Sequence, residues 1–125
     1  MGAFKVTTIQ DTAGANSSTT AQIYSGIVRA WVNFNGTGTV AIRASYNVTS
    51  ITDNGGNGNY TVNWTSGALP NSNYAVSGLP SGGTDRMITI QTLTNYTTSV
   101  CQIVVRGGGG SANDVDMVSM AAFSQ

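Results

Sequence analysis

Few residues of this chain could take part in acid–base or metal chemistry. The 125-residue sequence contains no histidine, one cysteine and five acidic residues, all of them aspartates. Without histidine, neither a Ser–His–Asp nor a Cys–His catalytic arrangement can form, and zinc lacks its usual set of imidazole and thiolate ligands. Four aspartates stand beside or shortly after glycine, asparagine, serine or threonine, in positions typical of turns or loop edges: Asp53, Asp85, Asp114 and Asp116.

The patterns around these aspartates do not match known catalytic or metal-binding motifs. A glycosidase needs two carboxyl groups held at a defined separation, and turn aspartates do not predict such a pair. The run Asp114-Val115-Asp116 falls short of an EF-hand calcium loop. Residues 107–110, four glycines, lack the lysine of a phosphate-binding loop and precede an expected strand. We therefore expect a protein that is not an enzyme and that uses no cofactor or metal ion.

The single cysteine, Cys101, is predicted to be a buried structural thiol. It follows Val100 and precedes the apolar run Ile103–Val105, and neither histidine nor lysine stands near it to lower the thiol pKa. With one cysteine, the fold contains no internal disulfide.

Recognition through loops is the remaining chemistry that these residues could support. Carbohydrate is bound by aromatic faces together with amide and hydroxyl groups, and binding sites favour loops held on a rigid scaffold. The turn Asn95-Tyr96-Thr97 should leave the Tyr96 ring outside the core. The candidate receptor- or glycan-binding residues are Tyr96, Asn95, Asn54, Asn57, Asp85 and Arg86. Each also suits a turn or a solvent-exposed loop without any binding role.

These candidate residues must be positioned by secondary-structure elements, and the composition of the chain predicts that these elements are β-strands. Threonine, valine, tyrosine, glycine and asparagine are abundant, and no window shows a sustained 3.6-residue apolar period. The formal net charge is zero and only 8% of residues are charged. Such a chain has no electrostatic footprint for nucleic acid or an anionic membrane, and no apolar run approaches the roughly 20 residues of a membrane helix.

The clearest pattern is an alternation on both sides of the turn at residues 36–38. The apolar positions before and after this turn are Val28, Ala30, Val32, Phe34 and then Val40, Ile42, Ala44, Tyr46. Placing Phe34 opposite Val40 makes the two apolar faces coincide, which a slip of one residue would destroy. The same register places Trp31 opposite Arg43 on the second face.

Two interpretations of this second face stay open. The Arg43 side chain could cover the Trp31 ring on a half-exposed sheet, a contact worth about 0.5–1 kcal/mol. Alternatively the face is an intersubunit contact, because a large indole on a polar face favours a partner. The last strand is apolar on both faces, so it should lie either mid-sheet or at a subunit interface. The subunit-interface candidates are Trp31, Arg43, Met117, Met120 and Phe123.

The remaining segments complete an expected antiparallel β-sandwich of about eight strands. The expected strands are 48–52 paired with 60–64, an edge strand between the prolines at 70 and 80, a hairpin of 86–94 with 98–106, and a closing strand at 114–125. Residues 4–10 should form a short strand and residues 11–21 a loop or extended linker. We expect an N-terminal segment over 1–21 and the β-sandwich domain over 22–125.

Three stretches of the sequence carry a family resemblance. The wording AWVNFNGTGTVAIRASYNVTSITDNG within residues 27–64 resembles segments in the distal regions of bacteriophage tail-fibre proteins, particularly those of marine and cyanobacterial phages. The opening FKVTTIQDTAGANS resembles the start of fibre modules, and the ending DVDMVSMAAFSQ resembles their closing strand. The turn DNGGNGNY is longer than the Asn-Gly turn of that pattern, and residues 65–113 match little.

The resemblance implies a homotrimeric virion protein that contacts other tail, baseplate or capsid proteins and attaches the particle to a host surface glycan. A chain of this length would be a minimal fibre, a tip protein or one subunit of a composite fibre. Two other functions stay open: a capsid decoration protein that stabilises the head, and a lectin-like carbohydrate-binding adhesin. The N-terminus has no apolar segment typical of a secretory signal, so we expect synthesis in the host cytoplasm and a final location in the virion.

Overall fold

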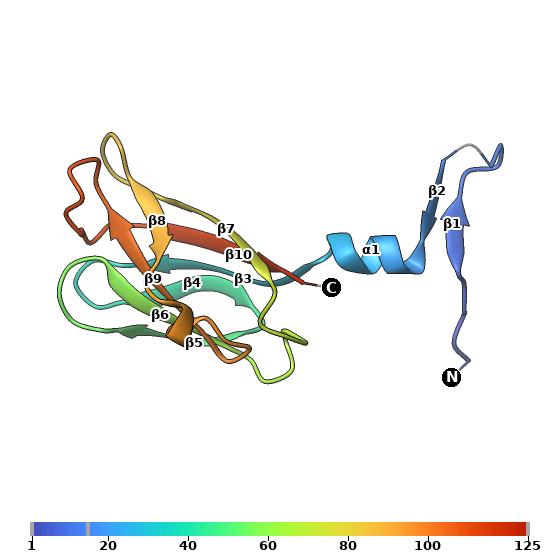
Figure 1. Ribbon diagram of the computed structural model, residues 1–125, viewed down its shortest axis with the longest axis horizontal. Helices are drawn as coiled ribbons and strands as arrows, with labels where there is room; N and C mark the ends of the chain where they lie inside the picture. Colours follow the sequence, from blue (N-terminus) through green and yellow to red (C-terminus); the bar gives the residue numbers. More distant parts are fainter. Residues whose placement is uncertain (1, 15, 125) are drawn as a thin grey trace.

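The computed structural model describes residues 2–14 and 16–124, and almost all its regular structure is antiparallel strand (Figure 1). The elements are β1 (Thr8–Gln10), β2 (Ser17–Thr19), α1 (Thr20–Gly26), β3 (Val28–Asn35), β4 (Ala41–Tyr46), β5 (Val48–Asp53), β6 (Asn59–Trp64), β7 (Ala75–Pro80), β8 (Met87–Ile90), the 3₁₀ turn η1 (Leu93–Asn95), β9 (Val100–Arg106) and β10 (Val118–Phe123). The predicted all-β class is confirmed.

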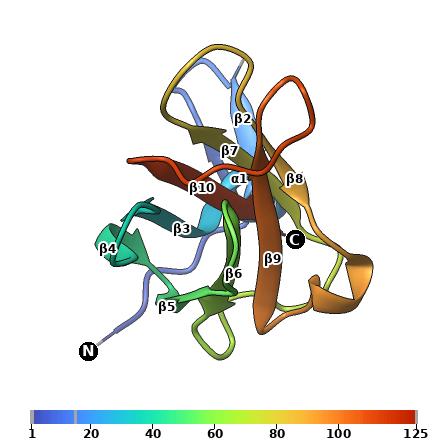
Figure 2. The ribbon, with the colours of Figure 1, turned by 90° about the vertical axis from the view of Figure 1, so that its left-hand side faces the viewer.

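Two four-stranded sheets share one hydrophobic core. Their strand orders are β4-β3-β10-β7 and β5-β6-β9-β8, and Figure 2 shows the two layers seen along the strands. Alternate residues of each inner strand point into the core, as the period of two in a strand requires. The largest fully buried side chains are Tyr60, Phe34, Ile103, Val32, Val62, Val105, Val118 and Cys101.

Several expectations from the sequence are confirmed. The predicted apolar face of the first long strand is buried at Ala30, Val32 and Phe34, and the strand at 60–64 buries its alternate residues too. The exception is Val28, which is half-buried and pairs with Phe123 beyond an irregularity in the register. Strand β5 pairs with β6, and β8 with β9. Strand β7 lies at a sheet edge, and β10 lies between β3 and β7. The mid-sheet position explains the apolar face of β10 that is buried at Val118, Met120 and Ala122, whereas Ala121 and Phe123 are half-buried on its other face.

The predicted register between β3 and β4 is wrong. A bulge leaves Arg43 without a ladder partner, so that Phe34 faces Ile42 and Trp31 faces Tyr46 instead of Arg43. All six residues of β4 are exposed. Strand β4 lies at the sheet edge, and the chain then crosses to the other sheet at Asn47, which has φ of 57°. An alternating apolar pattern on an edge strand therefore did not produce a buried face.

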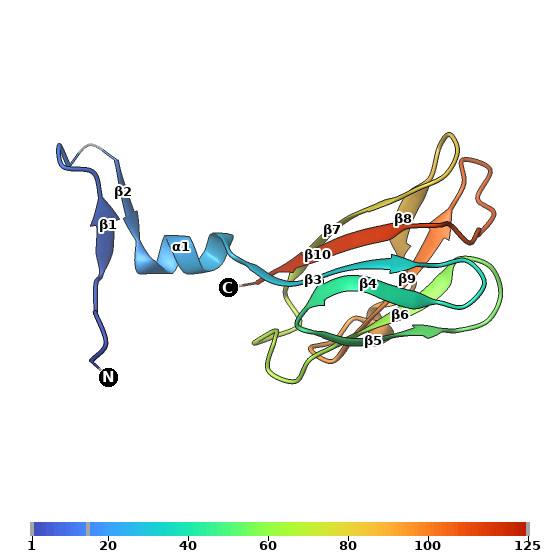
Figure 3. The same cartoon turned by 180° about the vertical axis from the view of Figure 1, so that it is seen from behind.

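The N-terminal arm, residues 2–26, projects from one end of the two sheets (Figures 1 and 3). It consists of the β1–β2 hairpin followed by helix α1, which lies partly within the expected linker and crosses the expected boundary at residues 21 and 22. The helix begins at a capping box. The backbone N–H of Gln22 donates to Thr19 Oγ1 at 3.1 Å, and the backbone N–H of Thr19 donates to the side-chain oxygen Oε1 of Gln22 at 2.8 Å. The Thr-x-x-Gln spacing is a recognisable helix-start signal that the strand-based interpretation overlooked.

Candidate functional site

Four glycine-rich loops meet at the end of the molecule opposite the N-terminal arm. These loops, which we call the loop tip, are residues 36–40, 54–58, 81–86 and 107–117. Figure 1 shows them together at the left, and Figure 3 shows the same end at the right. Because consecutive strands are antiparallel, every second connection returns to the same end of the sheets.

The 107–117 loop holds the other three loops in place. Its Val115 carbonyl accepts the Gly36 amide at 3.0 Å, and its Asp114 carboxylate accepts the Gly58 amide at 2.7 Å. The Met117 amide donates to Ser81 Oγ at 2.8 Å. A segment that contacts three separate loops makes the loop tip one connected surface.

The Tyr60 hydroxyl anchors this surface to the core. It lies 2.7 Å from the Gly36 carbonyl oxygen and 2.9 Å from Asp114 Oδ1, and its single proton can be donated to one of them at a time. Burial, followed by the hydrogen bond to Asp114, raises the Tyr60 pKa well above its ordinary value. The phenol is therefore neutral near pH 7 and acts as a hydrogen-bond donor, so Asp114 has a structural partner.

Four of the predicted binding residues lie on the loop tip. Asn54 donates to Thr61 Oγ1 at 2.9 Å, and Arg86 Nε donates to the Gly82 carbonyl at 3.0 Å, so both also stabilise their own loops. Asn57 and Asp85 are exposed. Asp85 has φ of 62°, a left-handed conformation that aspartate tolerates better than most residues. The structure thus places Asn54 and Asn57 on one loop and Asp85 and Arg86 on another at the same end of the sheets, and residues of the 107–117 loop contact both loops.

The expectation that the Tyr96 ring lies outside the core is wrong. Tyr96 is half-buried and its ring stacks on that of Tyr74, with centroids 4.2 Å apart and planes at 16°. Its hydroxyl donates to the Tyr74 carbonyl, and Asn95 donates to Gln102. Both residues lie before β9, at the end of the sheets opposite the loop tip. The 3₁₀ turn η1 folds the chain back across the open end of the core, where an aromatic ring excludes water.

The prediction of a buried Cys101 thiol is confirmed. Burial raises the pKa of this thiol from 9.0 to about 12, so it is neutral and a poor nucleophile at physiological pH. Trp64 and Tyr74 pack beside it in an edge-to-face pair with centroids 6.1 Å apart. The thiol is part of the core.

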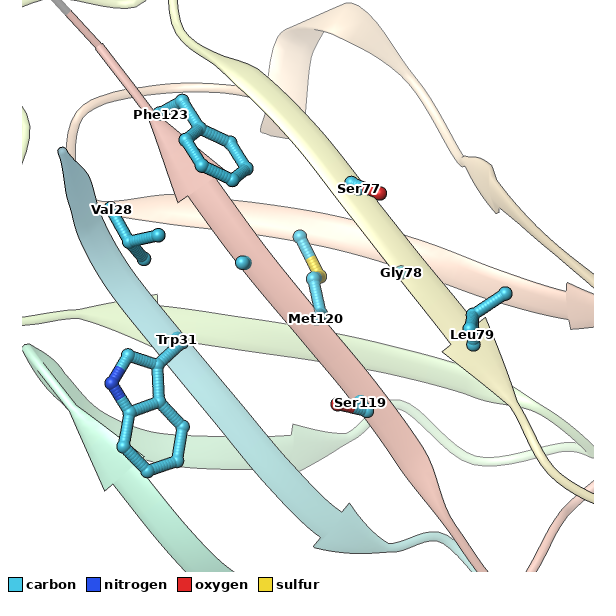
Figure 4. A pocket seen from close by; sticks show the side chains of 9 residues that line it. Val28, Trp31, Ser77, Gly78, Leu79, Ser119, Met120 and Phe123 are labelled. Carbon is cyan, nitrogen blue, oxygen red and sulfur yellow. The ribbon is translucent and has the colours of Figure 1, made fainter. Parts of the chain in front are cut away.

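A second surface feature lies on the sheet β4-β3-β10-β7, on the side away from the core. We call it the outer sheet face, and its apolar members are Val28, Trp31, Tyr46, Leu79, Ala121 and Phe123. Tyr46, Trp31 and Ala121 form one row across three strands, because Trp31 pairs with each of the other two. Most of these residues line a shallow groove of about 410 Å³ (Figure 4).

The five predicted interface residues divide between four places. Trp31, 39% exposed, and Phe123, half-buried, belong to the outer sheet face. Met120 is buried in the core and Met117 lies half-buried in the 107–117 loop. Arg43 is exposed at the β4 bulge. Tyr46 was not selected as an interface candidate, because only the bulge places it beside Trp31.

Comparisons with known proteins identify no relative of this chain. No protein-family model, no curated protein and no solved structure matches it. Within residues 2–14 and 16–124, no three side chains of histidine, cysteine, aspartate or glutamate group as metal ligands. No helix in that same part of the chain is both long and apolar enough to cross a membrane. The geometry of the loop tip and of the outer sheet face is the basis for a functional proposal.

Proposed function

We propose that this chain is a non-enzymatic virion protein of a bacteriophage, a tail fibre or fibre-tip component that attaches the particle to the host cell surface. In this proposal, the two sheets form an eight-stranded β-sandwich that assembles as a homotrimer. The observation that carries the proposal is the separation of the N-terminal arm from the loop tip, which lie at opposite ends of the sheets. An attachment protein needs one end for the particle and another for the cell.

The loop tip is the surface that we assign to the host. Its loops present backbone amides and carbonyls, the amide of Asn57 and the carboxylate of Asp85, groups that suit the hydroxyls of a surface glycan. A single shallow site of this kind binds weakly. Several copies within a trimer and several fibres on one particle would multiply weak sites into stable adhesion.

The test is the location of the protein in the particle. Gold-labelled antibodies or cryo-electron microscopy of the virion should place it at the distal end of the tail. Finding it on the capsid lattice would overturn the proposal and favour the decoration function, in which loss of the protein weakens heads rather than attachment.

A variant pair tests the loop tip separately. Asn57→Trp adds bulk to an exposed loop-tip position and should reduce binding of the labelled protein to host cells. The matched control is Ser72→Trp, at an exposed position in the β6–β7 connection at the opposite end. Equal binding by both variants would contradict the assignment of the loop tip to the host. Binding unaffected by free sugars would contradict a glycan receptor.

A further inference from the structure

The N-terminal arm is formed without support from the two sheets. Helix α1 has seven residues, none of them buried, and β1 and β2 are three-residue strands. Isolated helices below about 12 residues are marginal in water, and so are isolated two-stranded hairpins. The apolar side chains that the arm and its junction with β3 expose are Phe4, Val6, Ile9, Ile23, Tyr24 and Ile27. A stable arm of this kind needs a surface that its own domain does not provide.

The exposed apolar residues of the arm continue into the outer sheet face. Tyr24 and Ile27, at the end of the arm, lead directly to Val28, the first residue of β3. Val28 pairs with Phe123 of β10, and Trp31 lies farther along the same strand as Val28. Figure 4 shows Val28, Trp31 and Phe123 along the groove, with Leu79 on the neighbouring strand. The exposed apolar residues of the arm are therefore followed directly in the sequence by those of the outer sheet face, and we call the two sets together the strip.

The charges fit contact between identical surfaces. None of the six residues that define the outer sheet face is charged, and the chain has a formal net charge of zero. Arg29, at the junction with the arm, lies with its guanidinium carbon 4.0 Å from the centre of the Tyr24 ring, an arrangement that covers the charge with an aromatic face. Two copies that meet through the six residues of the outer sheet face do not bring like charges together.

We propose that the strip formed by the arm and the outer sheet face is the surface through which copies of this chain associate, side by side and in parallel. A parallel copy presents its arm at the height of the first arm and its sheet at the height of the first sheet, so both exposed apolar regions are covered at once. The proposal deepens the homotrimer of the proposed function and rests on it, because it names the contact surface of that assembly.

The experiment measures the mass of the full chain in solution by sedimentation velocity and light scattering. The wild-type protein should have a multiple of the 12.9 kDa chain mass. Leu79→Asp, at a position 74% exposed on the outer sheet face, should raise the dissociation constant at least about tenfold, because association would then bury a carboxylate in an apolar contact. Ile23→Asp should do the same from the arm.

The matched control is Leu93→Asp, which makes the same change at a leucine that is 84% exposed but lies in η1, away from the strip. Circular dichroism and thermal melting establish that each variant folds, and the exposed positions make folding of all three the expected result. An equal mass for Leu79→Asp and the wild type, or equal weakening by Leu93→Asp, would overturn the proposal.

Fluorescence quenching provides a readout at the surface itself. Trp31 is 39% exposed in the single chain, whereas Trp64 is 4% exposed. Association through the strip should therefore protect the emission of Trp31 from acrylamide as protein concentration rises, and Trp31→Phe should abolish that concentration dependence. A wild-type protein that remains monomeric up to about 100 µM, well above the micromolar dissociation constants of weak specific complexes, would also overturn the proposal.

These outcomes are independent of the location of the protein in the particle. An assembly that is dissociated by Leu79→Asp but lies on the capsid would refute the tail-fibre function and support the association surface. A monomer located at the tail tip would support the tail-fibre location and refute the association surface.

Discussion

Replacing Gly58 with alanine tests how the loop tip is held together. Gly58 lies at the start of β6 with φ of 66°, in the left-handed region. An alanine Cβ there would lie 2.5 Å from the Asn113 carbonyl oxygen and 2.7 Å from the Val105 carbonyl oxygen. Both are backbone atoms, so no side-chain rotation can relieve the contacts. The 107–117 loop and the end of β9 at Val105 must therefore move away from the 54–58 loop.

The cost follows from the hydrogen bonds that this movement breaks. The Gly58 amide donates to Asp114 at 2.7 Å, the Val105 amide donates to Gly58 at 2.8 Å, and the Asn113 amide donates to Val105 at 3.0 Å. At about 1 kcal/mol for each bond, their loss amounts to about 3 kcal/mol. The left-handed backbone adds about 1 kcal/mol for a residue with a Cβ. We expect Gly58→Ala to lower the free energy of unfolding by about 4 kcal/mol.

Gly56→Ala is the matched control. Gly56 has φ of 72° in the same loop, but nothing lies within 4 Å of an added Cβ. Only the backbone cost of about 1 kcal/mol applies, so the two variants should differ by about 3 kcal/mol. The assay is urea unfolding at pH 7 followed by circular dichroism, with the slope of free energy against urea compared between variants. Free energies for the two variants within about 0.5 kcal/mol of each other would refute the described contact between the loops.

Three further predictions concern the core and the arm. Tyr60→Phe removes the donor shared by the Gly36 carbonyl and Asp114 and should lower the free energy of unfolding by about 1.5–3 kcal/mol; an unchanged urea midpoint would contradict that role. The pKa of Cys101 is about 12 in the folded protein and 9.0 ordinarily, so its contribution to stability is constant below pH 9 and falls by about 1.4 kcal/mol per pH unit above it. Urea unfolding of the wild type and Cys101→Ala at pH 8 to 10.5 should show a steeper loss for the wild type, and equal slopes would be inconsistent with a buried thiol. Thr19→Ala removes the helix cap and should reduce protection of α1 amides from hydrogen exchange by up to about fivefold, the equivalent of about 1 kcal/mol; unchanged protection would show that the cap does not hold the helix.

Local chemistry determined much of this protein from the sequence alone. The alternation at residues 30–34 and 60–64 identified which side chains face the core, because the period of two is a property of the strand backbone itself. Val28 departs from this alternation because the strand is irregular at its pairing with Phe123. The apolar residues beside Cys101 in the sequence indicated a buried thiol, because a strand rich in apolar side chains packs into the core. The absence of histidine excludes imidazole chemistry on composition alone.

The tertiary structure decided which of these local patterns meet. Ile42 and Ala44 continue the alternation of Val32 and Phe34, but β4 is an edge strand with a bulge, so its pattern predicted a register and a burial that do not occur. A local period cannot distinguish an edge strand from a central one, because the difference lies in neighbours that are distant in the sequence.

The same physical reason separates the two groups of predicted binding residues. The loops that contain Asn57 and Asp85 lie at the same end of the sheets because the antiparallel order of the strands returns them there. The turn that contains Tyr96 lies at the other end, where its ring covers the core beside Tyr74. Turn residues look alike in sequence, whereas their distance from the core and from one another depends on long-range strand pairing.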